Sequence, residues 1–220
     1  MSDIINSFLL VYAGLFPIVN PIGGAPIFLG LTRLSTDQER EAISRKVAVN
    51  GFFLLMGSVF VGSYVLEFFG ITLPIVRIAG GLVVTAFGWR MLHSGDVVDT
   101  PPAADPNARR LGLRDAFYPL TMPLTVGPGS ISVAITIGSQ RPKEPTADWV
   151  RLAEVGGGAV LGIVAMAASI YVCYRFSDRI MPFLGENGTN VLVRLSAFIL
   201  LCIGIEIIWT GYSALGSPPA

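Results

Sequence analysis

Prolines, glycines and small polar residues are concentrated in two segments, FPIVNPIGGAP at 16–26 and YPLTMPLTVGP at 118–128. The two segments align without a gap, and their three prolines coincide at an offset of 102 residues. A proline removes a backbone donor and clashes with the preceding turn, so three within ten residues should interrupt a helix. The amides freed at such a break attract a carboxylate, and the freed carbonyls attract an ammonium group or a cation.

We therefore expect two unwound stretches, 20–25 and 122–129, which together bind a small zwitterion between donors and acceptors. The predicted substrate-binding residues are Asn20, Pro21, Gly23, Gly24, Thr121, Thr125, Gly127, Gly129 and Ser130, with Ser132 as a further polar side chain placed to line the site. Two alternatives stay open. A single proline motif serves equally well as a packing kink, and hydroxyls in membrane helices often bond to their own backbone.

The elements that position these residues are predicted to be membrane helices. Of the 220 residues, 52% are hydrophobic and only 14% are charged, whereas soluble domains carry roughly 25% charged residues. The formal net charge is 0, which disfavours nucleic-acid binding. Runs long enough to cross a bilayer, about 20 residues each, lie at 4–32, 47–66, 68–89, 116–140, 155–174 and 189–212.

A second internal match, VRIAGGL at 76–82 with VRLSAFI at 193–199, pairs the third run with the sixth. Each half of the chain then holds three spans, so the second half enters the membrane from the opposite side. The expected fold is an all-α membrane protein of two inverted three-helix repeats with helices 1 and 4 broken, typical of secondary transporters. The expected organisation is one membrane domain over 1–220, with repeat 1 at 1–93, a cytoplasmic linker at 94–113 and repeat 2 at 114–213.

The distribution of Lys and Arg predicts the orientation, because basic loops stay in the cytoplasm. Three connectors on one side hold ten basic residues, and the opposite side holds three, which are Arg141, Lys143 and Arg151. Both termini should therefore be non-cytoplasmic, in a multi-pass protein of the inner (plasma) membrane.

Three charged residues fall inside predicted spans: Arg77, Arg194 and Glu206. Intramembrane charge is expensive, and marks a functional hypothesis. Arg77 and Glu206 should lie at similar depth and approach each other, directly or through water. Glu206 is alternatively a proton-coupling carboxylate, and Arg77 alternatively snorkels to the interface. For Arg194 the candidate partners are Asp115 and Asp178. We find no metal-ligand cluster, nucleophile–base pair or phosphate loop, so neither a cofactor nor a catalytic residue is expected.

These motifs resemble the MarC family of integral membrane proteins over essentially the whole chain. The likeness is carried by NPIG at 20–23, PIF at 26–28, RIAGG at 77–81, PLTMP at 119–123, GPG at 127–129 and RL at 194–195. The resemblance implies a six-span inner-membrane protein, some of whose relatives transport glycine, alanine and similar amino acids with a cation gradient. Gly24 stands where many relatives carry Asn, and Glu206 where a neutral residue is usual.

The expected function is a secondary transporter of small neutral amino acids or a similar small metabolite, held between helices 1 and 4. The expected partners are that substrate, a coupling proton or Na⁺, and the lipid bilayer; a homo-oligomer is compatible with the sequence. A passive small-solute channel and a non-transporting membrane scaffold or regulatory protein remain alternatives.

Overall fold

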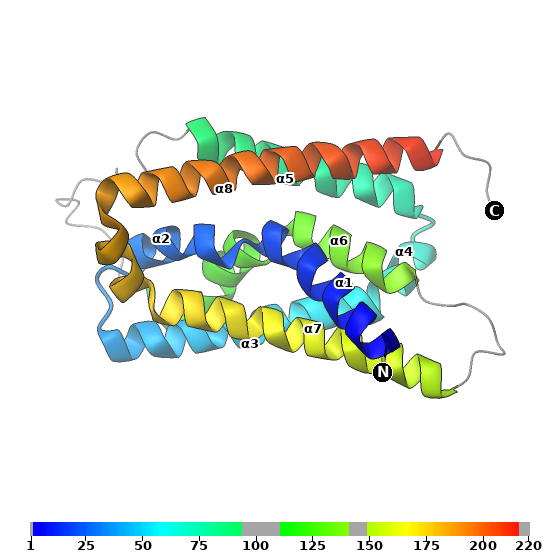
Figure 1. Ribbon diagram of the computed structural model, residues 1–220, viewed down its shortest axis with the longest axis horizontal. Coiled ribbons are helices and arrows are strands. Elements are labelled where there is room, and N and C mark those ends of the chain that lie inside the picture. Colours follow the sequence, from blue (N-terminus) through cyan, green and yellow to red (C-terminus); the bar gives the residue numbers. More distant parts are fainter. Residues whose placement is uncertain (1, 94–110, 141–148, 216–220) are drawn as a thin grey trace.

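A computed structural model describes residues 2–93, 111–140 and 149–215, and every regular element within these ranges is helical (Figure 1). The elements in chain order are α1 (Ser2–Val19), α2 (Pro21–Leu31), α3 (Asp37–Phe60), α4 (Gly62–Phe68), α5 (Leu73–His93), η1 (Leu113–Ala116), η2 (Phe117–Thr125), α6 (Pro128–Ser139), α7 (Trp149–Arg175) and α8 (Ser177–Leu215). Most of the predicted linker, 94–110, lies outside the described residues.

Four helices are long and apolar enough to cross a membrane: α3, α5, α7 and the 187–215 part of α8. Two further pairs of consecutive helices are long enough to cross a membrane only when the two helices are taken together, and each pair is bent. Asp3–Val19 and Pro21–Leu31 meet at 41°, and Leu113–Thr125 and Pro128–Ser139 meet at 70°. The prediction of an all-helical protein with several membrane-crossing helices is confirmed, with four crossings, or up to six if each bent pair is one crossing.

The helices are arranged in layers (Figure 1). α5 and α8 lie side by side along one face, α1, α2 and α6 occupy the middle, and α3 and α7 form the opposite face. Glycines allow the closest approach between α5 and α8: a Cβ at Gly88 would lie 2.8 Å from the Leu201 backbone nitrogen, and one at Gly81 2.8 Å from the Gly204 carbonyl. Small residues at helix contacts are the usual means of close packing within membranes.

The largest buried cluster lies where the middle layer meets α3 and α7, around Leu15, Phe28, Leu55 and Tyr174. A smaller cluster between α5 and α8 is covered by Ile18 and Ile27 of the middle layer. Large apolar side chains also cover the outside, such as Phe198 at 54% exposure. Exposed apolar side chains over whole helices fit a protein whose surroundings are lipid.

α3 begins ten residues before the apolar run predicted at 47–66. Its start is fixed by a capping box, in which Thr36 Oγ1 accepts from the Glu39 amide at 3.3 Å and Glu39 Oε2 accepts from the Thr36 amide at 2.8 Å. A capping box satisfies two amides that otherwise lack acceptors. The first turns of α3 are thus polar, and hydropathy alone misses them.

Candidate functional site

The first break consists of one residue, Asn20, between α1 and α2. Its backbone is left-handed, with φ 46° and ψ 58°, a conformation that asparagine tolerates better than most residues. Its Oδ1 accepts from the Gly23 amide at 3.1 Å, and its carbonyl accepts from the Gly24 amide at 2.9 Å. Asn20 therefore ends one helix and caps the next.

The expectation of an unwound stretch over 20–25 is wrong in extent, because residues 21–31 are helical. The physical reason is that Pro21 occupies the first helical position, where its fixed φ and missing donor are tolerated. The prolines still remove hydrogen bonds. Pro21 provides no amide for the Pro17 carbonyl, and Pro26 provides none for the Ile22 carbonyl. Two carbonyls next to Asn20 thus lack their usual helical donors.

The second break is longer and runs through η2 to the start of α6. Tyr118 and Met122 have extended φ and ψ, and the bonds preceding Pro119 and Pro123 are cis. Hydroxyl groups replace lost amide donors along this segment: Thr121 Oγ1 donates to the Ala116 carbonyl at 2.6 Å, and Thr125 Oγ1 to the Leu120 carbonyl at 2.7 Å.

Thr121 and Thr125 are 0% and 2% exposed, and each has a second polar partner. The Asn50 side-chain amide donates to Thr121 Oγ1 at 3.4 Å, and the Tyr174 hydroxyl lies 2.9 Å from Thr125 Oγ1. The Thr125 hydroxyl has one hydrogen, which it donates to the Leu120 carbonyl. The Tyr174 hydroxyl is therefore the donor in its hydrogen bond with Thr125 Oγ1. Both threonines hold the break together here, so their contact with a substrate stays a prediction.

Tyr174 joins the two breaks, and sequence reasoning missed it. Its fully buried ring stacks on Phe28 of α2, with centroids 4.4 Å apart. Its hydroxyl contacts Thr125 on one side and lies 2.7 Å from where a Cβ would stand at Gly24 on the other. A tyrosine near the end of an apolar helix is typical of a membrane interface, so no signal in the sequence places it between the breaks.

α6 begins at Pro128 without a side-chain cap. Gly129 and Ser130 are buried, and their amides are the first in the helix, where no intrahelical acceptor exists. Ser130 Oγ donates back to the Gly127 carbonyl at 2.9 Å. Ser132 instead donates to the Val76 carbonyl of α5 at 2.8 Å, so it connects two helices, and its contact with a substrate stays a prediction.

The predicted direct ion pair between Arg77 and Glu206 is absent from the described part of the chain. α8 presents Gly204, Ile208 and Gly211 to α5, and Gly211 packs against the Arg77 Cβ. Glu206 falls on the other side of α8 and is exposed. Among the described residues the Arg77 Nε atom is buried without a hydrogen-bond partner. The partner of Arg194 stays a prediction; one candidate, Asp178, lies 3.8 Å from Arg40.

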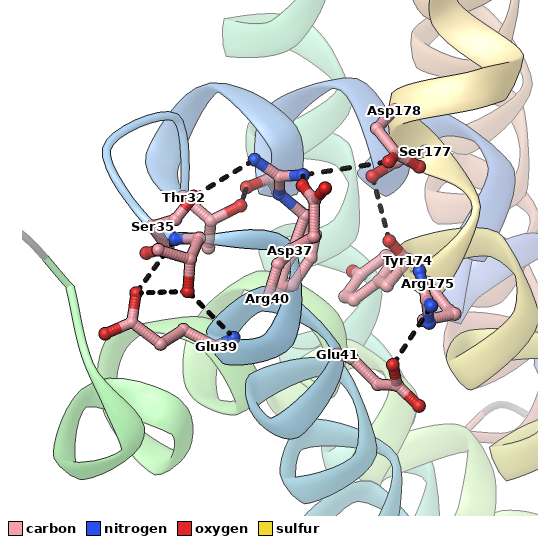
Figure 2. A network of polar contacts seen from close by, with 12 residues as sticks. Thr32, Ser35, Asp37, Glu39, Arg40, Glu41, Tyr174, Arg175, Ser177 and Asp178 are labelled. Carbon is pink, nitrogen blue, oxygen red and sulfur yellow. Dashed lines mark hydrogen bonds and ion pairs between the residues drawn. The ribbon is translucent and has the colours of Figure 1, made fainter.

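A polar network closes the end of the bundle where α3 begins (Figure 2). Arg40 Nη1 lies 3.1 Å from Asp37 and 3.8 Å from Asp178, at the start of α8. Arg175, the last residue of α7, pairs with Glu41 of α3 at 3.0 Å. Because Tyr174 lies directly beside Arg175, these ion pairs cover the end of the bundle next to the tyrosine.

Arg40→Gln is expected to loosen this end of the bundle. Cys173 precedes Tyr174 and is partly buried, and in a Cys202→Ser background it is the one thiol of the chain. Partly exposed ion pairs stabilise by up to about 1 kcal/mol each, so a hydrophilic maleimide should label Cys173 about threefold to tenfold faster. Arg33→Gln, at an exposed residue of the preceding loop, serves as the control. Equal labelling rates in Arg40→Gln and Arg33→Gln would show that the Arg40 ion pairs do not close this end of the bundle.

Comparison with known proteins identifies the family. The profile described as "MarC family integral membrane protein" matches residues 5–215. The chain belongs to the MarC family. It is 33% identical over 216 residues to the UPF0056 inner membrane protein MarC of Salmonella typhimurium strain LT2, and equally to that of Escherichia coli strain SMS-3-5. Each alignment covers 96% of both chains. No solved structure matches the chain.

Family membership confirms the resemblance stated from the sequence motifs. The MarC relatives are named as inner membrane proteins, and this chain has several apolar helices of spanning length. The chain is accordingly an integral membrane protein. The relatives' names specify no substrate.

Proposed function

We propose that the protein is a secondary transporter of small neutral amino acids, of about the size of glycine or alanine. The observation that carries the proposal is the pair of helix breaks, which have complementary backbone groups. At the first break the Pro17 carbonyl, at the end of α1, has no helical donor, and at the second break the buried residues Gly129 and Ser130 provide amides without intrahelical acceptors. Carbonyls attract the ammonium end of an amino acid and helix-start amides its carboxylate.

Helix packing supports a single site between the two breaks. α1 and α6 run antiparallel (Figure 1), and a Cβ at Gly14 would lie 3.2 Å from Ile137 Cδ1. Asn20 lies six residues after Gly14 along α1, and Ile131 lies six residues before Ile137 along α6. Both steps cover about 9 Å at ~1.5 Å per residue, so Asn20 is level with the first turn of α6. α2 also contacts η2 directly.

Inverted repeats are part of the proposal, and the packing supports them. If the bent pairs are spans 1 and 4, each span packs against its predicted repeat mate: α1 on α6, α3 on α7, and α5 on α8. The contacts between unlike spans also have counterparts, since α5 packs on α6 while α8 packs on α2. A pseudo-two-fold relation of this kind allows alternating access by rocking one half against the other.

Tyr174 favours a small substrate. The Tyr174 hydroxyl occupies the space beside Gly24, and the Tyr174 ring stacks on the ring of Phe28. We expect a site bounded by these groups to accept glycine or alanine, whose side chains are a hydrogen atom and a methyl group, and to exclude larger side chains. We propose coupling to a proton or Na⁺ without assigning a residue to it, because Glu206 is exposed on α8 away from α5.

The test is counterflow of labelled glycine and alanine in liposomes that contain the purified protein, with protein-free liposomes as the control. We expect saturable exchange that unlabelled alanine inhibits and unlabelled phenylalanine does not. Flux without saturation would indicate a passive channel instead. No flux across a panel of small metabolites would indicate a membrane scaffold or regulatory protein.

A further inference from the structure

A pocket lined by both polar and apolar side chains lies at the end of the bundle opposite the Arg40 network. Its volume is about 250 Å³, and it is lined by α1, α6 and α7 together with the end of α3. α1 leads from this end of the bundle to the first break, and α6 leads back to this end from the second break (Figure 1). Residues of both helices line the pocket.

Opposite charges stand together in the lining of this pocket. Arg151 Nε of α7 lies 3.6 Å from Asp3 Oδ2 of α1, and their side chains are 63% and 39% exposed. Hydrogen bonds between ammonium-type nitrogens and carboxylates are typically ~2.7–2.9 Å long, so this pair is loose. It leaves donors on the guanidinium and acceptors on the carboxylate free for a ligand. Asn6 and Gln140 add side-chain amides to the lining.

The buried part of the lining is apolar. Val11, Val59 and Ala159 line the pocket and are 0%, 2% and 5% exposed. A bound molecule therefore has room for a small aliphatic group inward and for its charged groups at the Asp3–Arg151 pair.

The ion pair is not required to hold α1 on α7. Gly158 and Gly162 already bring α7 against the backbone of Ile4 and Phe8. Ser7 Oγ also donates to the Val155 carbonyl at 2.7 Å. Since a loose, half-exposed ion pair adds little to stability, a ligand can separate the two charges at low cost.

We infer that this pocket is an entry site that binds small zwitterionic amino acids before they reach the helix breaks, an inference that rests on the proposed function. The carboxylate of the ligand binds Arg151 and its ammonium group binds Asp3. A simple anion is repelled by Asp3 and a simple cation by Arg151, so the pair selects molecules that carry both charges. The helix breaks then bind a substrate that the Asp3–Arg151 pair has already selected by its charges.

The test measures alanine binding by equilibrium dialysis and alanine exchange in liposomes on the same variants. Arg151→Gln and Asp3→Asn should each raise the dissociation constant and the half-saturating concentration about tenfold, since each removes one charged contact. The maximal rate should stay within about twofold. Arg151→Lys should keep most of the affinity. Glu67→Gln, at an exposed acid of α4 outside the pocket lining, is the control. Acetate and methylamine should not compete.

The outcomes separate the entry site from the transport function. Exchange by the wild type with unchanged half-saturation in both neutral variants overturns the entry site and leaves the proposed function standing. Binding that is lost in both variants, without exchange by the wild type, supports the pocket and overturns transport. No binding by the wild type overturns the entry site.

Discussion

Asn20→Ala is expected to slow alanine counterflow about thirtyfold or more. Alanine in the left-handed conformation costs about 1–2 kcal/mol, and loss of the cap on Gly23 costs about 1 kcal/mol more. Each 1.4 kcal/mol corresponds to about tenfold in an equilibrium constant. The substitution therefore disfavours the left-handed turn at the first break and removes the geometry that exposes the Pro17 carbonyl.

Asn20→Gly separates backbone conformation from capping. Glycine adopts the left-handed conformation freely but supplies no side-chain oxygen, so its exchange rate should fall between those of Asn20→Ala and the wild type. Initial counterflow rates at equal reconstituted protein measure this order. Wild-type rates in both variants would show that the first break does not contribute to transport.

Gly138→Ala is expected to lower the unfolding temperature by about 2–12 °C. A Cβ at Gly138 of α6 would overlap the backbone carbonyl of Val59 in α3, and a helix backbone shifts less easily than the end of a flexible side chain. Overpacking costs about 1–3 kcal/mol, and a chain of this size loses about 2–4 °C per kcal/mol. Thermal unfolding in detergent, followed by intrinsic tryptophan fluorescence, measures the shift.

Gly156→Ala is the matched control, because the same methyl group at Gly156 of α7 meets no atom within 4 Å. Replacing a helical glycine by alanine stabilises by about 1 kcal/mol when space permits. The unfolding temperature of Gly156→Ala should stay level or rise by a few degrees. A rise in both variants would contradict the close contact between α6 and α3.

The two proline motifs found in the sequence, 102 residues apart, lie where the structure bends two helix pairs, because proline acts locally on the backbone. The extent of each break was not predictable. Whether the helix resumes at Pro21 depends on the Asn20 cap, and the course of 117–125 depends on hydroxyls of Thr121 and Thr125 that replace backbone donors.

Contacts between helices were the least predictable part of the site. Depth along a span follows from counting residues, and it placed Arg77 and Glu206 at a similar level. Rotation about the helix axis depends on packing, and Gly204 and Gly211 turn the other side of α8 toward α5. Tyr174 and the Arg40 network depend in the same way on how α7 meets α2 and α3.

The most direct test of the substrate site is an experimental structure of the protein with and without saturating alanine. We expect additional density between the two breaks in the alanine-bound structure alone, with the carboxylate against the amides of Gly129 and Ser130 and the ammonium group near the Pro17 carbonyl. Alanine bound elsewhere, with no density between the breaks, would contradict the account.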